Sequence, residues 1–153
     1  MHIKPFEQSD SFCGPAALRI VLNHFGIKKT EKEIARLAKF KLSTGVEAED
    51  LLRVAKKLGM KGFIKDLSTI KDIRKYLKNE KQAIIVEWFL EDDGHFSVIS
   101  EIDRENIYLQ DPSLGHIRAI KISRFLRIWF TFPGRYIKNK DDLILRRMLV
   151  IHV

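Results

Sequence analysis

The chain has 153 residues, of which 45% are apolar and 31% are charged, and this composition is typical of a globular protein rather than a disordered one. No apolar run approaches the ~18 residues of a membrane span, and the opening "MHIKPFEQSD" lacks the apolar stretch of a signal peptide, so we expect a soluble cytoplasmic protein. The net charge of +8 raises the question of nucleic acid, but the basic residues alternate with Glu and Asp and no zinc-finger, RNP-type or Gly-rich phosphate motif is present, so we do not favour that partner.

Four amphipathic helices are predicted in the first half of the chain. Residues 15–25 carry apolar side chains at three- and four-residue spacing and end at Gly26. The sequence "TEKE" is a capping box that opens a second helix over residues 30–38. Residues 47–58, which end before Gly59, give a third helix, and residues 69–77 give a fourth.

From residue 83 the pattern becomes that of β-strands. The segments "AIIVEWFL", "HFSVISEI" and "NIYLQD" are strand-like and are joined by the turns "EDDG" and "DREN". A short helix around "SRFLRIWF" and a final strand, "LILRRMLVIHV", complete the chain. Helices followed by a mostly antiparallel sheet predict an α+β fold. Because no repeat, linker or low-complexity segment divides the chain, we expect a single domain over residues 1–153.

The only cysteine, Cys13, lies in the stretch "EQSDSFCGPAAL". With Asp10 or Ser11 as the N-cap and Pro15 in the first helical turn, Cys13 would lie at the positive end of a helix dipole, where a thiolate is favoured. Gly14 would leave the sulfur open to an acyl group. The alternative is a small buried core residue. A single cysteine excludes an internal disulfide and a zinc site built on paired cysteines, and we expect no metal or organic cofactor.

A thiolate nucleophile needs a base, and His95 is the best placed of the five histidines. His2 and His152 lie near the termini, His24 lies inside the first predicted helix, and His116 follows a glycine in a predicted turn after "DPSL". His95 follows "EDDG" and begins a predicted strand, so we expect it at the mouth of that strand beside aromatic and aliphatic side chains.

Two further residues complete a candidate constellation. Asp111 ends the strand "NIYLQDP", and it shares a face with His95 if the "DREN" turn closes the hairpin with an odd-numbered loop, for which Asn106 can adopt the left-handed conformation. A carboxylate there would orient the imidazole and stabilise its protonated form. Gln8, five residues before Cys13, offers a side-chain N–H to an oxyanion, and the backbone N–H of Cys13 offers another. Taken singly, each residue also has an ordinary structural role as an alternative.

The ordered set of motifs resembles peptidase family C39, the papain-like cysteine peptidases first associated with bacteriocin-processing transporters. The resemblance rests on "Q-x4-CGPAAL", then "LNHFG", "GHFSVI" and "IYLQDP", and extends over most of the chain. It implies a papain-like α+β fold with Cys13 on a central helix and with His95 and Asp111 on the sheet facing it. It also implies peptide-bond hydrolysis through a thioester acyl-enzyme, with Cys13 as nucleophile, His95 as general base and then acid, Asp111 as its orienter and Gln8 as oxyanion donor.

Family members that cleave double-glycine leader peptides are fused to transporter membrane and ATPase domains, whereas this chain has no membrane span and no Walker motif. We therefore expect a standalone domain with a peptide or protein substrate, and a separately encoded transporter is an open partner. A transpeptidase or amidase using the same triad and a non-catalytic peptide-binding module are the alternatives. The acidic turn at residues 91–93 would favour basic residues in a substrate.

Overall fold

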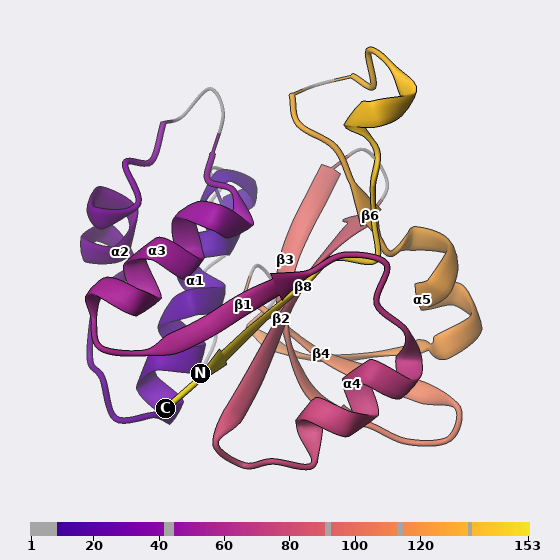
Figure 1. The fold of residues 1–153 in the computed structure, drawn as a ribbon, viewed down its shortest axis with the longest axis horizontal. Helices are drawn as coiled ribbons and strands as arrows, with labels where there is room; N and C mark the ends of the chain where they lie inside the picture. The colour runs from indigo at the N-terminus through magenta and orange to yellow at the C-terminus, as the bar shows by residue number, and fades with distance from the viewer. Residues whose placement is uncertain (1–8, 42–44, 91–92, 113–114, 135) are drawn as a thin grey trace.

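The chain folds into a six-stranded antiparallel sheet with helices on both faces (Figure 1). The computed structural model describes residues 9–41, 45–90, 93–112, 115–134 and 136–153. The helices are α1 (Ser9–His24), α2 (Glu31–Leu37), α3 (Ala48–Lys57), α4 (Ile70–Leu77) and α5 (Ile122–Ile128), with a 3-10 turn at Lys140–Asp142. The strands are β1 (Lys61–Lys65), β2 (Gln82–Leu90), β3 (Asp93–Ile102), β4 (Asn106–Asp111), β5 (His116–Lys121), β6 (Phe130–Thr131), β7 (Ile144–Leu145) and β8 (Met148–His152).

The strands of the large sheet lie in the order β1-β8-β2-β3-β4-β5, and β6 and β7 form a separate antiparallel pair. Every neighbouring pair in the large sheet is antiparallel. Helices α1 to α3 lie on one side of this sheet and α4 and α5 on the other (Figure 1). This arrangement of helices on an antiparallel sheet confirms the predicted α+β class.

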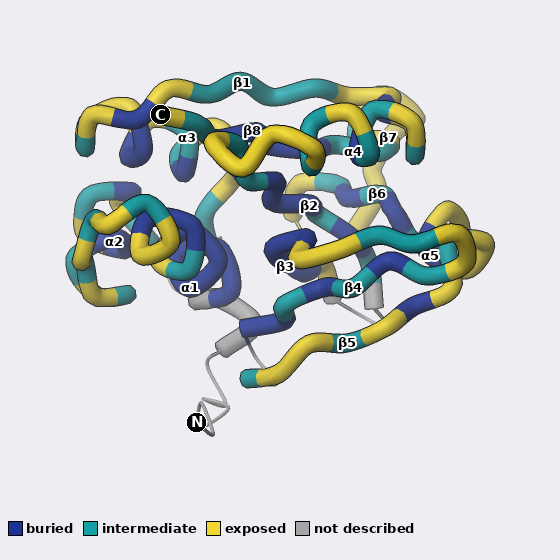
Figure 2. Tube along the Cα trace, turned by 90° about the horizontal axis from the view of Figure 1, so that it is seen from below, coloured by how far each residue is buried: buried dark blue, intermediate teal, exposed yellow. Residues whose placement is uncertain are grey.

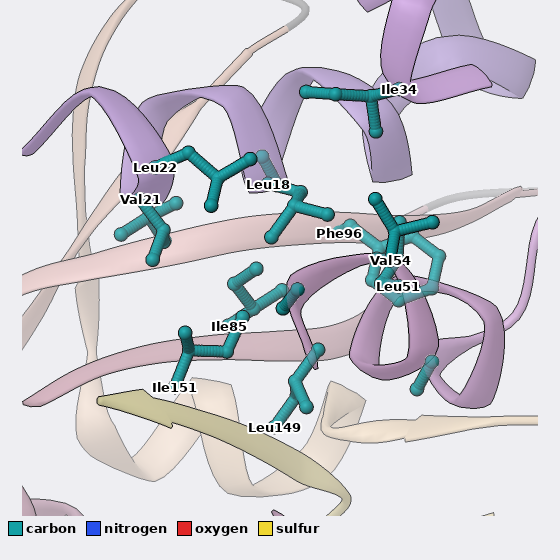
Figure 3. Close-up of a cluster of buried hydrophobic side chains, with 14 of the residues drawn as sticks. Leu18, Val21, Leu22, Ile34, Leu51, Val54, Ile85, Phe96, Leu149 and Ile151 are labelled. Carbon is teal, nitrogen blue, oxygen red and sulfur yellow. The ribbon is translucent and has the colours of Figure 1, made fainter. Parts of the chain in front are cut away.

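Strand alternation divides the interior into two apolar clusters, one on each face of the sheet. In β2, Ile85 faces α1 and α3, whereas Ile84 and Val86 face α4 and α5. In β8, Leu149 belongs to the first cluster and Val150 to the second. Figure 3 shows the first cluster, in which side chains of α1 and α3 meet those of β2, β3 and β8. Two buried layers therefore hold the central strands in place from both sides.

The predicted starts of the second, third and fourth helices are confirmed by their caps. Thr30 before α2 and Thr69 before α4 each accept a hydrogen bond from a backbone N–H of the first turn, and an acidic side chain bonds back in each case. Glu47 is the N-cap of α3, and α3 ends at Lys57, within one residue of the end predicted for the third helix. These local signals need no tertiary contact, which is why the sequence alone locates them.

Three strand features were not predicted. Strands β1 and β5 were missed, and His116 begins β5 instead of lying in a turn. Figure 2 shows β5 at the edge of the sheet with much of its length exposed, and its six-residue sequence is short and half polar, which gives a weak strand signal. The predicted final strand is two strands, β7 and β8, because Arg146 has a φ of 51° and turns the chain between them.

Candidate active site

Cys13 lies in α1 with only 4% of its surface exposed. The helix begins at Ser9, so the prediction that Asp10 or Ser11 caps it and that Cys13 lies in its first turn was wrong. In an α-helix the fifth residue donates its N–H to the carbonyl four residues earlier, so the N–H of Cys13 is not one of the open donors of the first turn. Pro15 is likewise inside the helix. The predicted oxyanion donor from the backbone of Cys13 is therefore not available in this geometry.

Gly14 is the point at which α1 meets β3. A Cβ atom built on Gly14 would lie 2.5 Å from Cγ2 of Val46 and 3.3 Å from Cδ2 of Phe96. The first separation is shorter than a normal Cβ contact, so a side chain at residue 14 would have to displace Val46, and the second is tight against the Phe96 ring of β3. A glycine at this position therefore allows α1 to pack closely against both side chains. Because Gly14 follows Cys13 and Phe96 follows His95, the contact links the two candidate residues through their chain neighbours.

His95 lies near the start of β3 and is 8% exposed. It pairs with Trp88 of β2, and the two ring centroids are 5.5 Å apart. Within the part of the chain that the structure describes, Nδ1 of His95 is buried and has no hydrogen-bond partner. An unpaired buried nitrogen is costly unless another group, such as a thiol or a substrate, completes its hydrogen bonding.

Asp111 ends β4 and is 1% exposed. Val98 pairs with Gln110, and the antiparallel register continues with Ser97 opposite Asp111. Residues two apart on a strand share a face, so Asp111 lies diagonally across from His95 on the same face. The structure thus brings His95 and Asp111 to one face of neighbouring strands.

The shared face results from a bulge in β3 rather than from the turn. Ile99 pairs with Leu109 but Glu101 pairs with Tyr108, so Ser100 is an extra residue in β3. Its hydroxyl donates to the carbonyl of Tyr108 at 3.2 Å. The predicted left-handed Asn106 was wrong, because its φ is not positive. The extra residue that brings His95 and Asp111 to the same face is therefore Ser100 within β3, and not a residue of the turn.

His95 and Cys13 occupy opposite sides of β3. Alternation gives His95 the side of Trp88 and Ser97, where the indole Nε1 donates to the hydroxyl of Ser97 at 2.9 Å. Helix α1 covers the side of Phe96 instead. Gly94, directly before His95, is exposed and has no side chain, and a Cβ atom built on it would contact Thr131 and Phe89.

Two predicted features lie outside the described residues: Gln8, and residues 91–92 of the acidic turn. His116, which we had placed in a turn, pairs with Asp111 across β4 and β5. The alternating pattern "HIRAIK" after Gly115 was the signal for this strand, although it is short and polar.

Glu87 of β2 was not singled out from the sequence. It pairs with Phe96 and therefore lies on the α1 side of the sheet. The pKa of Glu87 is raised from 4.5 to about 7, mainly by burial and to a smaller extent by the carboxylates of Glu49 and Glu47, while Arg147 and a hydrogen bond from Thr131 oppose the rise. A carboxyl group that titrates near neutral pH thus lies on β2, directly opposite Phe96, which follows His95 on β3.

The positive charge that lowers the pKa of this carboxyl group already has partners. Arg147 makes a bidentate pair with Asp66, at 2.7 and 3.0 Å, and donates to Glu49 at 2.8 Å. Hydrogen bonds to Asp66 and the surrounding carboxylates raise the pKa of Arg147, so it stays charged. Sequence reasoning could not find this cluster, because its members come from segments far apart in the chain.

An aromatic stack adjoins Glu87. Phe89, two residues farther along the same face of β2, stacks on Phe130 and on Phe132 with ring centroids 5.2 Å apart in each case. All three rings keep part of their surface exposed. A Cβ atom built on Gly94 would lie 3.5 Å from the hydroxyl of Thr131, so this stack and the glycine before His95 are neighbours.

Over the described ranges no three His, Cys, Asp or Glu residues are grouped as metal ligands would be. In the same ranges no helix has the length and apolar character that a bilayer crossing requires.

Comparisons with known proteins agree on one family. A model described as the peptidase C39 family matches residues 3–132. An uncharacterized protein of Methanothermobacter thermautotrophicus is 34% identical over 123 residues, which cover 80% of each chain.

Solved structures share the fold. The peptidase domain of Streptococcus ComA, a bi-functional ABC transporter involved in a quorum-sensing pathway, matches with a TM-score of 0.71 at 18% identity, over 97% of this chain and 96% of that one. A double glycine motif protease from an AMS/PCAT transporter, solved with its leader peptide, matches with a TM-score of 0.65 at 18% identity, over 92% and 83%. These likenesses confirm the papain-like fold that the sequence motifs implied.

Proposed function

Because the chain belongs to the peptidase C39 family, we propose that it is a cysteine peptidase in which Cys13 is the nucleophile and His95 the general base. The observation that carries the proposal is the buried, unpaired Nδ1 of His95 on the strand against which the Cys13 helix packs. The proposal requires the Cys13 thiol and the His95 imidazole to approach each other at the end of β3 that begins with Gly94 and His95.

The chemistry follows from these roles. His95 removes the proton from the Cys13 thiol, and the thiolate attacks the scissile carbonyl carbon to give a tetrahedral oxyanion. When the oxyanion collapses, the C–N bond breaks and His95 returns the proton to the leaving amine, which leaves a thioester on Cys13. His95 then deprotonates water, the hydroxide attacks the thioester, and the acid product and the thiol are released.

Two further residues have supporting roles in this proposal. Asp111, on the same face as His95, would orient the imidazole and stabilise its cation. Gln8 would donate to the oxyanion. The substrates are peptides or proteins, and a separately encoded transporter would be the natural partner. A reactive thiol must stay reduced, so the proposal implies a reducing compartment such as the cytoplasm.

The test is the pH dependence of Cys13 alkylation by iodoacetamide in the wild type, in His95→Ala and in the exposed control His24→Ala. An assembled pair predicts an apparent thiol pKa well below ~8.5 in the wild type and in His24→Ala, and a higher value in His95→Ala. If all three proteins react alike, no Cys–His pair exists and the peptidase proposal fails. The peptide-binding alternative predicts that failure. A transpeptidase or amidase would pass this test and would differ in whether water or an added amine accepts the acyl group.

A further inference from the structure

The α1 side of the sheet carries a carboxyl group that the proposed mechanism does not use. Glu87 pairs with Phe96, and the Phe96 ring packs on the helix turn that bears Cys13. A peptide that extends from Cys13 along the α1 side of β3 towards Gly94 would therefore pass beside Glu87. Glu87 as a residue keeps part of its surface exposed, although burial desolvates its carboxyl group.

Within the described chain, this carboxyl group has no cationic partner of its own. Arg147 acts electrostatically on Glu87, but its guanidinium is bound to Asp66 and Glu49, and none of the ion pairs among the described residues includes Glu87. The hydroxyl of Thr131 supplies one hydrogen bond, which leaves the carboxylate further acceptor positions.

The surroundings of Glu87 favour a cation. Glu47 and Glu49 at the start of α3 add negative potential at Glu87. The rings of Phe89, Phe130 and Phe132 offer apolar faces on which the stem and charged head of a long basic side chain can lie.

We infer that Glu87 and the stack of Phe89, Phe130 and Phe132 form a subsite for a lysine or arginine side chain next to the scissile bond. The inference rests on the proposed function, because it supplies the substrate class of that same site. The residues that would select a basic substrate side chain here differ from those of the acidic turn at residues 91–93. The competing explanation is structural: Glu87 ties β6 to the sheet through Thr131 and meets no substrate.

The test compares arginine with citrulline, which keeps the shape and removes the charge. A fluorogenic peptide library carries one or the other in turn at each of about four positions on either side of the cleaved bond, with mixed residues elsewhere. At one position the wild type should cleave the arginine peptides at about pH 8 with a kcat/KM about tenfold higher than the citrulline peptides. Glu87→Gln should reduce that ratio to about one, while the exposed control Glu101→Gln should keep it.

The pH dependence separates the two explanations. As Glu87 gains its proton between about pH 8 and about pH 6, the arginine preference should decline, with Arg147, Glu47 and Glu49 as the charged groups that face it. A purely structural Glu87 would change the cleavage of both peptide sets equally. Equal cleavage of arginine and citrulline peptides by the wild type, or a preference that survives in Glu87→Gln, would overturn the inference.

Measuring peptide binding to the Cys13→Ala variant distinguishes failure of the Glu87 subsite from failure of the proposed peptidase function. Fluorescein-labelled versions of the same peptide mixtures are titrated with Cys13→Ala and with the double variant that also carries Glu87→Gln. Tighter binding of arginine peptides that is lost in the double variant supports the subsite even if the wild type cleaves nothing, which would refute only the peptidase. Equal binding of both peptide sets refutes the subsite, whatever the outcome of cleavage.

Discussion

Replacing Glu87 by glutamine should stabilise the protein at alkaline pH and have little effect near pH 5. The folded state holds the proton of Glu87 more tightly than the unfolded chain, because burial raises its pKa from 4.5 to about 7. As pH rises between these values the unfolded chain loses the proton first, so the stability contributed by protonated Glu87 is progressively lost. Glutamine keeps an oxygen for the Thr131 hydroxyl and never carries the charge.

The magnitude follows from the two pKa values. Each pH unit between them corresponds to about 1.4 kcal/mol, so ionised Glu87 costs the folded state about 3 kcal/mol at about pH 8 and less than about 1 kcal/mol at about pH 5. All other titrating groups are common to both proteins, so the difference between variant and wild type isolates Glu87.

Urea unfolding followed by tryptophan fluorescence at both pH values measures this difference. The free energy of unfolding of Glu87→Gln should exceed that of the wild type by about 2 to 3 kcal/mol more at the higher pH than at the lower. An excess that is the same at both pH values, or that shrinks as pH rises, would show that the folded protein does not desolvate this carboxylate. Glu101→Gln, at an exposed position, should give no pH-dependent difference.

Three further predictions concern residues around the site. Gly14→Ala should lower the free energy of unfolding by about 1 to 3 kcal/mol, because its Cβ has no space, and an unchanged thermal midpoint would contradict this packing. Trp88→Phe should lower the free energy of unfolding by about 1 to 3 kcal/mol, because the buried Ser97 hydroxyl loses the indole donor. Adding Ser97→Ala should recover part of this loss in urea unfolding, and no recovery would argue against the hydrogen bond. Arg147→Met should raise the pKa of Glu87 above about 7, measured by carboxyl carbon NMR titration, and a fall would contradict the electrostatic role of Arg147.

The predictable part of the fold is the part that local chemistry determines. Thr30 and Thr69 cap their helices through bonds within four residues, and the alternating apolar strands from residue 83 onward fill both buried faces of the sheet. The start of α1 was misjudged because Pro15 and its neighbours are typical of a first helical turn, whereas the helix begins at Ser9. The edge strand β5 was missed because an exposed edge needs little apolar sequence.

The candidate site was predictable in its residue types but not in its surroundings. The motifs around Cys13, His95 and Asp111 identify the family from a single sequence. The desolvation of Glu87 depends on packing against β6 and on charges from α3 and Arg147, which come from distant parts of the chain. No periodicity or spacing in the sequence encodes such a contact.

The bulge at Ser100 restricts how the number of residues between His95 and Asp111, in the β3–β4 hairpin, can change. Without it, the pairing of Ile102 with Ile107 would continue so that Asp111 faced Val98, on the apolar side of the sheet away from His95. Deleting Ser100 would therefore turn the carboxylate over, even though the turn and both strands remained. An insertion or deletion of one residue between His95 and Asp111 would do the same, while a change of two would restore the facing. Among homologues that keep both residues, the length of this segment should therefore vary in steps of two, or change by one only together with a gained or lost bulge.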